Sequence, residues 1–153
     1  MAYTSIDDPS GTAFNTVLYT GNASTRSITG VGFQPDWVWI KVRNYDNGHQ
    51  LFDVVRGVTK RLQTDTNGAE ATRSSSITSF DSDGFSMGAD AQINDTSSYN
   101  YVAWNWKAGT SFSNDASATS VGSIDSSGSI NTTVGFSIIT YTGTGSAATF
   151  AHG

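Results

Sequence analysis

The stretch DWVWIKVRN, residues 36–44, decides the fold, because branched aliphatic residues recur in it at every second position. Successive side chains of an extended strand point to opposite faces, so Val38, Ile40 and Val42 share one face. The other face carries Trp37, Trp39, Lys41 and Arg43. An aliphatic face opposed to an aromatic and basic face predicts a β-strand with one buried side.

A second stretch, YVAWNWKAG at residues 101–109, alternates in the same way. Val102 shares a face with Trp104 and Trp106, while Tyr101 and Ala103 point the other way. Burying a Trp ring in a core contributes about 3–5 kcal/mol, which favours the tryptophan face as the buried one. The predicted core is therefore Val38, Ile40, Val42, Phe85, Val102, Trp104 and Trp106.

Short strand-like runs separated by turn residues continue along most of the chain. Asp83-Gly84 and Asn47-Gly48 lie between such runs and predict hairpins. Only residues 66–73 have a helical composition, so we expect less than ~15% helix, against about a third in average proteins. These features predict an all-β fold, an antiparallel sandwich or barrel. The further predicted strands are 16–20, 26–29, 50–55, 77–80, 85–88 and 135–142.

Two stretches of the chain resemble each other: FNTVLYTGNASTRSITG at residues 14–30 and FSIITYTGTGSAATFAHG at residues 136–153. Both begin with Phe and continue to Tyr-Thr-Gly, at Tyr19 and at Tyr141. We interpret the second stretch as the first hairpin of a second, similar unit in a tandem array, in which the natural chain continues past Gly153. Convergence of two Ser/Thr/Gly-rich hairpins is the alternative.

These patterns divide the chain into four expected segments. They are an N-terminal arm at 1–13, a β-sandwich unit at 14–109, a polar connector at 110–133, and the first hairpin of a second unit at 134–153. The connector is rich in Ser, Asn, Asp and Gly, which favours a linker or loosely paired edge strands. The arm contains DDPSG, whose residues are poor strand formers, and we expect it to lie on a neighbouring subunit.

Composition excludes several classes of function. Charged residues make up 14% of the 153 residues, well below the usual quarter, and the net charge is −5. The 8 basic residues are scattered, so we expect no nucleic-acid partner. The chain has no cysteine and no apolar run near the roughly 20 residues of a membrane span, which excludes disulfides and predicts no membrane insertion. Its beginning lacks a signal-peptide pattern, so we expect synthesis in a cytoplasm.

Sequence signatures of an enzyme are nearly absent. Neither His49 nor His152 has a patterned Ser or carboxylate partner, and the chain has a single Glu. We therefore expect no catalytic residue and no cofactor. Four aspartates lie close enough in sequence to suggest Ca²⁺, but they lack the ligand spacing of a calcium loop, so we interpret them as turn caps and expect no metal. They are Asp81, Asp83, Asp90 and Asp95.

The candidate binding residues are Trp37, Trp39, Lys41 and Arg43, on the half-exposed face of the strand predicted within residues 36–44. Exposed aromatic rows bind partner proteins or sugars, so a protein interface, a glycan site and ordinary core packing stay open for the two tryptophans. A shallow basic strip is a further candidate, with a solvated strand face as the alternative. Its residues are Lys41, Arg43, Arg56, Lys60 and Arg61.

A series of blocks along residues 2–153 resembles a family of virion structural proteins of tailed bacteriophages, whose members are described as tail-fibre or structural proteins. The blocks are YTSIDDPS, LYTGN, GFQPDWVWIK, LFDVVRG, SFDSDGFSMG and YVAWNWKAG. The resemblance implies a β-sandwich of the concanavalin A-like, SPRY-like or jelly-roll type. It implies no chemistry for individual residues.

We therefore expect a non-enzymatic virion protein, the N-terminal module of a tail-fibre or receptor-binding protein. Its expected partners are other virion proteins, further copies of itself in a symmetric homo-oligomer, and a host-surface glycan. The alternatives are a capsid decoration or head-fibre protein and a lectin-like sugar-binding module. The expected location is the virion.

Overall fold

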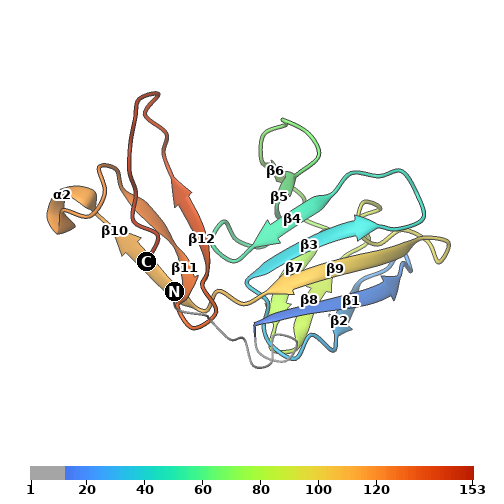
Figure 1. Ribbon diagram of the computed structural model, residues 1–153. Coiled ribbons are helices and arrows are strands. Elements are labelled where there is room, and N and C mark those ends of the chain that lie inside the picture. Colours follow the sequence, from blue (N-terminus) through green and yellow to red (C-terminus); the bar gives the residue numbers. More distant parts are fainter. Residues whose placement is uncertain (1–12) are drawn as a thin grey trace. The chain divides into compact units, whose positions relative to one another are not determined.

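The computed structural model describes residues 13–153, and the chain divides into two compact units, Met1–Lys107 and Ala108–Gly153 (Figure 1). The described residues are 44% strand and 3% helix. This composition confirms the expected all-β fold with little helix. The expected N-terminal arm at 1–13 lies outside the described residues, apart from Ala13, which is buried and whose carbonyl accepts the Lys107 N–H at 2.8 Å.

Unit 1 contains a large antiparallel sheet with the strand order β1-β9-β3-β4-β5-β6. The first and the last of its strands along the chain, β1 and β9, pair with each other along their whole length. β3 pairs with the other edge of β9. The two alternating stretches that decide the fold are thus adjacent central strands. The strands are β1 (Phe14–Thr20), β3 (Trp37–Val42), β4 (Gln50–Asp53), β5 (Lys60–Gln63), β6 (Ala71–Thr72) and β9 (Asn100–Trp106).

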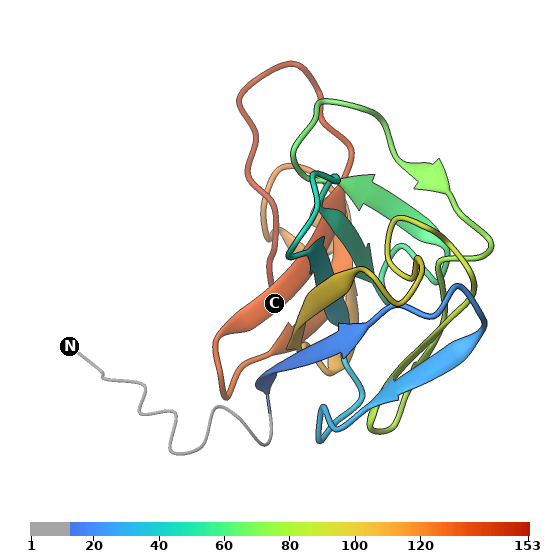
Figure 2. The ribbon, with the colours of Figure 1, turned by 90° about the vertical axis from the view of Figure 1, so that its right-hand side faces the viewer.

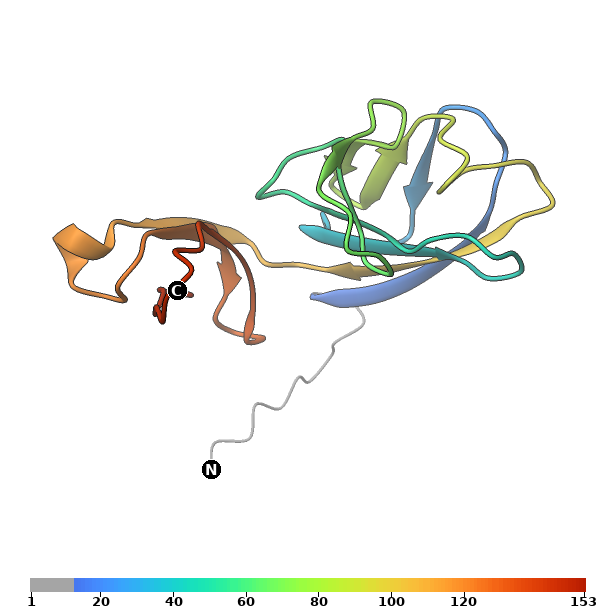
Figure 3. The ribbon, with the colours of Figure 1, turned by 90° about the horizontal axis from the view of Figure 1, so that it is seen from above.

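A smaller sheet forms a second layer of unit 1, seen beside the large sheet in Figure 2 and Figure 3. It has the order β2-β8-β7 and consists of β2 (Arg26–Thr29), β7 (Ile77–Asp81) and β8 (Gly84–Met87). Buried side chains from both sheets form one core, as expected for sheets packed face to face. The core consists of Tyr19, Ile28, Val38, Ile40, Val42, Phe52, Ile77, Phe85, Met87, Ile93, Tyr101 and Ala103.

Both expected hairpins are present: β3 pairs with β4 across the Asn47-Gly48 loop, and β7 pairs with β8. The second turn lies one residue earlier than expected, because Gly84 already pairs with Asp81. Gly84 has φ +151°, and a Cβ there would collide with the carbonyl of Ile28 on the adjacent strand. Glycine is therefore required where β8 begins against β2.

The predicted core face of β9 was wrong for Trp104 and Trp106, which are only partly buried. Tyr101, Ala103 and Asn105 point into the core instead. The physical reason is the pairing with β3: Trp104 lies directly opposite Trp39, and directly opposite residues share a face. Since Val38, Ile40 and Val42 fill the inner face of β3, the tryptophans of both strands must face outward. The other five residues of the predicted core are buried as expected: Val38, Ile40, Val42, Phe85 and Val102.

The region predicted as a helical turn, residues 66–73, is an irregular loop that includes the short strand β6. Its residues pair with β5, a strand that alternation did not reveal. The pairing satisfies backbone groups that an isolated turn of helix would leave open. Among the residues that the structure describes, no helix has the length and apolar character of a membrane span.

Unit 2 is a three-stranded antiparallel sheet in the order β10-β11-β12. Its elements are β10 (Thr110–Asn114), the one-turn helix α2 (Ala116–Thr119), β11 (Ser126–Asn131) and β12 (Phe136–Tyr141). The linker interpretation of the polar connector at 110–133 was therefore wrong, because that segment supplies two strands that pair with each other and with β12; of the two alternatives, paired edge strands is the nearer one, since β10 is the edge strand of this sheet. Strand pairing satisfies the backbone of this Ser- and Gly-rich segment although it has few apolar side chains.

The expected hairpin at 134–153 was also wrong. β12 pairs with β11, and the residues after it form one isolated parallel bridge, between Phe150 and Ile124. The similar stretch in unit 1 is no hairpin either, since β1 and β2 belong to different sheets. What the two stretches share is the initial strand, which is an edge strand in both sheets.

Candidate binding face

The outward-facing side of the large sheet carries rows of side chains that run across its strands. Strand register places Trp104 between Thr16 and Trp39, and Leu51 beside Trp39. A second row places Trp106 between Phe14 and Trp37. We define the outer face by the residues of these rows and of a third one at the other end of the strands. Its residues are Phe14, Thr16, Leu18, Trp37, Trp39, Lys41, Leu51, Leu62, Val102, Trp104 and Trp106.

Ring contacts link the aromatic residues of the outer face. Trp39 lies 5.2 Å from Trp104 and 5.9 Å from the ring of His49, measured between ring centroids. Trp106 lies 4.7 Å from Phe14 and meets Trp37 edge-on at 6.4 Å. Such tilted and edge-to-face pairs are favourable because the rings carry quadrupoles, so the rings are held in fixed positions.

All four tryptophans are partly buried, which leaves part of each ring on the surface of unit 1. The indole N–H of Trp39 donates to the Thr64 hydroxyl at 3.1 Å, so its polar atom has a partner within the sheet. Leu18, at the end of β1, is 62% exposed. The outer face therefore presents preformed aromatic and aliphatic surface that needs no rearrangement before contact.

The structure places three of the four predicted binding residues on the outer face: Trp37, Trp39 and Lys41. The Lys41 ammonium donates to the Asn47 carbonyl at 2.8 Å and is thereby held toward the β3–β4 loop. Arg43 follows the end of β3 and is exposed. The sequence prediction missed Trp104 and Trp106 as members of this face. Two Trp-x-Trp motifs in neighbouring strands were the available signal.

Three members of the expected basic strip have partners within the sheet, and two of them, Arg56 and Lys60, lie within 4.0 Å of the same carboxylate, that of Glu70. Arg56 binds the nearly buried carboxylate of Asp53 at 2.7 Å and that of Glu70 at 3.2 Å. Lys60 donates to the Thr72 hydroxyl at 3.0 Å. Arg61 donates to the Gln50 side chain, and burial lowers the pKa of its guanidinium. These cations brace the strands β4, β5 and β6 against each other.

The four aspartates once considered for Ca²⁺ each accept hydrogen bonds from their own neighbourhood. Asp83 accepts the N–H groups of Gly30 and Gly32, at 3.0 and 2.7 Å. The other three accept from Ser79 and Ser86 (Asp81), from Ser76 and Gln92 (Asp90), and from Thr96 (Asp95). Within residues 13–153, no three acidic or histidine side chains are grouped so that they could hold a metal ion. Asp83, Asp90 and Asp95 thus accept backbone N–H groups in turns and loops, whereas Asp81 accepts the hydroxyls of two strand residues, Ser79 and Ser86.

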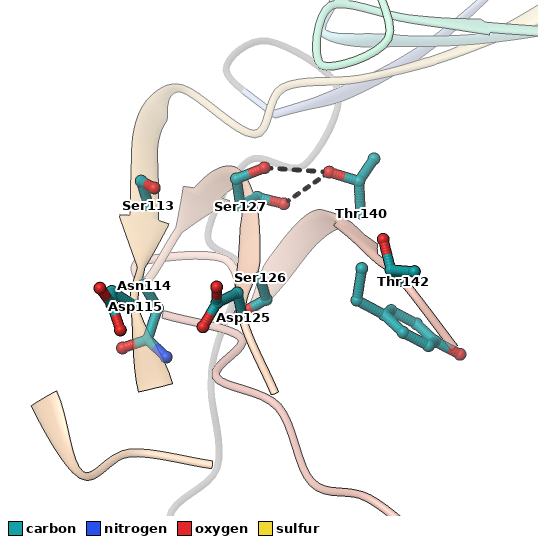
Figure 4. A pocket seen from close by; sticks show the side chains of 9 residues that line it. Ser113, Asn114, Asp115, Asp125, Ser126, Ser127, Thr140 and Thr142 are labelled. Carbon is teal, nitrogen blue, oxygen red and sulfur yellow. Dashed lines mark hydrogen bonds between the residues drawn. The ribbon is translucent and has the colours of Figure 1, made fainter. Parts of the chain in front are cut away.

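A hollow of about 340 Å³ opens on unit 2, between the ends of its strands (Figure 4). Asp115 and Asp125 line it, but both carboxylates bind the first turn of α2. Asp115 is the N-cap and accepts the N–H groups of Ser117 and Ala118; the Ser117 hydroxyl, which also donates to it, lowers the pKa of Asp115 most. These carboxylates organise a loop, so the outer face of unit 1 is the better candidate site.

Comparison with curated proteins and with solved structures found no match. A family model described as a domain of unknown function (DUF7483) matches residues 8–153, which covers both units. The chain therefore belongs to the DUF7483 family.

Proposed function

We propose that this chain is a non-enzymatic structural module of a tailed-bacteriophage particle, the N-terminal module of a tail-fibre or receptor-binding protein, and that it acts through protein–protein contacts of the outer face. The observation that carries the proposal is the set of four partly exposed tryptophans on one side of one sheet. The phage context is supported by the resemblance of the sequence blocks from YTSIDDPS to YVAWNWKAG.

Aromatic residues favour this assignment for energetic reasons. Trp and Tyr are enriched at protein interfaces and supply most of the binding energy where they are central to the contact. Trp39 and Trp104 are held by ring contacts and by the sheet, so little side-chain entropy is lost on binding. The one charged residue of the outer face, Lys41, lies in the row away from the tryptophans, as in an interface with an apolar centre and a polar rim.

Sugar binding is a second candidate function, supported by a specific feature of the same face. The hydroxyls of Thr16 and Thr64 flank the Trp104 and Trp39 rings, with His49 next to Trp39. Flat aromatic surface bordered by hydroxyl groups suits the apolar face and the hydroxyls of a sugar ring. A glycan array with the intact chain, and with Trp39→Ala as control, tests this candidate.

The proposed function is tested in phage particles that carry the gene with single substitutions. We expect Trp39→Ala and Trp104→Ala chains to fold but to be lost from purified particles at least about tenfold, as judged by quantitative mass spectrometry. Tyr45→Ala is the matched control, because Tyr45 is an exposed aromatic residue in the β3–β4 loop, off the outer face. Circular dichroism and thermal unfolding of each chain exclude misfolding as the cause.

Two outcomes would contradict the proposal. Wild-type chain found only in the soluble lysate, and not in purified particles, would show that it is no virion component. Unchanged incorporation of both tryptophan variants would show that the outer face makes no assembly contact. Immunogold labelling of the particles distinguishes a tail position from a capsid position, and labelling of the capsid would overturn the tail-fibre assignment.

A further inference from the structure

The chain contains two Asn-Gly dipeptides, Asn47-Gly48 in the β3–β4 loop and Asn67-Gly68 in the β5–β6 loop. An asparagine that precedes glycine loses its side-chain amide more readily than other asparagines. The reason is that the backbone nitrogen of glycine has no Cβ beside it to hinder attack on the asparagine Cγ. The two dipeptides are identical in sequence, so the structure around each of them decides how they differ.

The side chain of Asn47 already contacts the nitrogen that can attack it. The Gly48 N–H donates to the Asn47 side-chain carbonyl at 2.9 Å. It takes no part in the β3–β4 ladder, whose pairs end at Ile40 and Gln50. A rotation about the Cβ–Cγ bond therefore presents the carbon to the Gly48 nitrogen without movement of the backbone. Groups held this close react with less loss of entropy than the same groups in a free chain.

The Lys41 ammonium lies where the reaction develops negative charge, because it donates to the Asn47 backbone carbonyl at 2.8 Å. The Gly48 nitrogen loses its proton before it attacks, and the carbonyl oxygen of the same peptide bond shares the resulting charge. A cation on that oxygen stabilises the anion. The Asp65 carboxylate also lies near Gly48, but it accepts the His49 N–H at 3.1 Å and leaves the Gly48 N–H to Asn47.

The second dipeptide has a different geometry. The Gly68 N–H donates to the Thr66 hydroxyl at 3.4 Å, and among the described residues no hydrogen bond joins it to the Asn67 side chain. No lysine or arginine of residues 13–153 donates to the Asn67 carbonyl. The chain therefore carries the same dipeptide with and without the arrangement found at Asn47.

We propose that Asn47 is a site of spontaneous covalent modification, in which the Gly48 backbone nitrogen attacks Cγ of Asn47. A C–N bond forms between these atoms, and the bond from Cγ to the side-chain nitrogen breaks. The side-chain nitrogen leaves as ammonia and takes up the proton that Gly48 has lost. The product is a cyclic succinimide. Water then adds to one of the two ring carbonyls and opens the ring, which leaves either aspartate or isoaspartate in place of Asn47.

The modification changes the margin of the outer face, to which Lys41 belongs. Either product places a carboxylate near the Lys41 ammonium, and isoaspartate also adds a carbon atom to the backbone of the loop. The loop has little room for this, because even a Cβ on Gly48 would collide with the Gln63 side chain. The inference concerns the covalent state of the β3–β4 loop and is independent of the proposed role of the outer face, so each proposal can fail without the other.

The test is incubation of the intact chain at physiological temperature and mildly alkaline pH. Protease digestion and tandem mass spectrometry measure the conversion of both dipeptides in the same sample, and a methyltransferase that recognises isoaspartate labels the product. We expect Asn47 to convert at least about threefold faster than Asn67, because the attack on Asn47 begins from atoms already in contact.

Chain variants test the role of the cation. Lys41→Gln should slow the conversion of Asn47 about threefold and leave that of Asn67 unchanged, because it removes the positive charge from the Asn47 carbonyl. Lys60→Gln is the matched control, since Lys60 lies in β5 and donates to the Thr72 hydroxyl at 3.0 Å. It should leave the conversion of Asn47 unchanged. Circular dichroism of both variants checks that the fold is kept.

Three results would overturn the proposal. One is the absence of product at Asn47 after a time in which an unfolded peptide with the sequence of residues 43–53 has converted, which would mean that the loop prevents ring closure. Another is conversion of Asn67 that is as fast as that of Asn47. The last is conversion of Asn47 that Lys41→Gln leaves unchanged although the fold is kept.

Discussion

Two stretches of this chain, residues 14–30 and 136–153, are alike in sequence, and each begins with a β-strand. The matching side chains are buried in the first stretch and exposed in the second. Tyr19 of β1 is 8% exposed, whereas Tyr141 of β12 is 54% exposed. Ile28, in the strand that follows β1, is 5% exposed, whereas Phe150, in the corresponding place after β12, is 37% exposed. The local sequence therefore specifies the strand but not its burial.

The difference lies in the neighbouring strands. In unit 1, Tyr19 is covered by Tyr101, and its hydroxyl donates to the Ile93 carbonyl at 2.8 Å. Ile28 lies opposite Phe85 in the small sheet. In unit 2 the strand opposite β12 is β11, which carries Ser126 beside the tyrosine. Burial thus depends on which strand the rest of the chain supplies as a partner.

The largest expected effect comes from the two tyrosines. Tyr19→Ala should destabilise unit 1 by about 3–5 kcal/mol, because it opens a cavity and leaves the Ile93 carbonyl without its donor. Tyr141→Ala should change the stability of unit 2 by less than about 0.5 kcal/mol. All four tryptophans lie in unit 1, so urea unfolding followed by tryptophan fluorescence reports on that unit.

Amide NMR signals of β12 report on unit 2 in the same titration. Equal losses of stability for Tyr19→Ala and Tyr141→Ala would mean that Tyr141 is covered in solution. This result would contradict the difference in burial between β1 and β12.

The next largest effect concerns Ile28 and Phe150. Ile28→Ala should cost about 2–5 kcal/mol, because Ile28 belongs to the core between the sheets. Phe150→Ala should cost less than about 1 kcal/mol, although it removes the larger side chain, since Phe150 keeps much of its surface in water. The urea midpoints of the two variants check this ranking, measured by tryptophan fluorescence for Ile28→Ala in unit 1 and by the amide NMR signals of β12 for Phe150→Ala in unit 2. A larger loss for Phe150→Ala would contradict it.

A smaller effect depends on pH and on Asp83. The N–H groups of Gly30 and Gly32 hold the pKa of the Asp83 carboxylate below its usual value of 3.8. Because the folded-state pKa is the lower one, the contribution to stability is fully present above the unfolded-state pKa and is lost as the pH falls below it. Asp83→Asn should therefore lessen the acid sensitivity of unit 1.

The measurement is the urea midpoint of unit 1 at neutral pH and at a pH below 3.8. Other acids also titrate in this range, so the difference between wild type and variant isolates Asp83. An identical loss of stability in both chains would remove Asp83 from the explanation.

The smallest effect is expected for Asp115, which caps the one-turn helix of unit 2. Its hydrogen bonds lower the pKa of its carboxylate, chiefly the one from the Ser117 hydroxyl, so this contribution too is lost in acid as the folded-state pKa is passed. Asp115→Ala should free the N–H groups of Ser117 and Ala118 and speed their exchange, without change in unit 1. Amide exchange by NMR checks this, and unchanged exchange at both residues would contradict it.

The alternating stretches were sufficient to predict much of unit 1. Val38, Ile40 and Val42 are buried, and both turn dipeptides lie in hairpins. The faces of β9 were not predictable from β9 alone, because its larger and more apolar side chains, Trp104 and Trp106, lie on the outward face, and Ala103 and Asn105 lie on the inward one. Only its pairing with β3, a long-range contact, sets Trp104 on the outer side.

Unit 2 was harder to predict for a related reason. Its strands β10 and β11 consist mainly of Ser, Asn and Gly, which have little strand preference of their own. Their pairing depends on β12, which does have the strand-forming sequence FSIITY. The candidate site also depended on long-range pairing. Trp37 and Trp39 were predicted from the sequence, whereas Trp104 and Trp106 could be assigned to the outer face only from the register between β3 and β9.

The most direct test of the central claim, that the partner strand and not the local sequence decides burial, is amide hydrogen exchange of the intact chain. Residues 14–20 and 136–141 are compared in one sample. Those amides of β1 that pair with β9 should exchange only on global opening of unit 1, and those amides of β12 that pair with β11 at least about a hundredfold faster, by local opening. Equal protection of the two strands would contradict the claim, because the repeated sequence would then carry its stability with it.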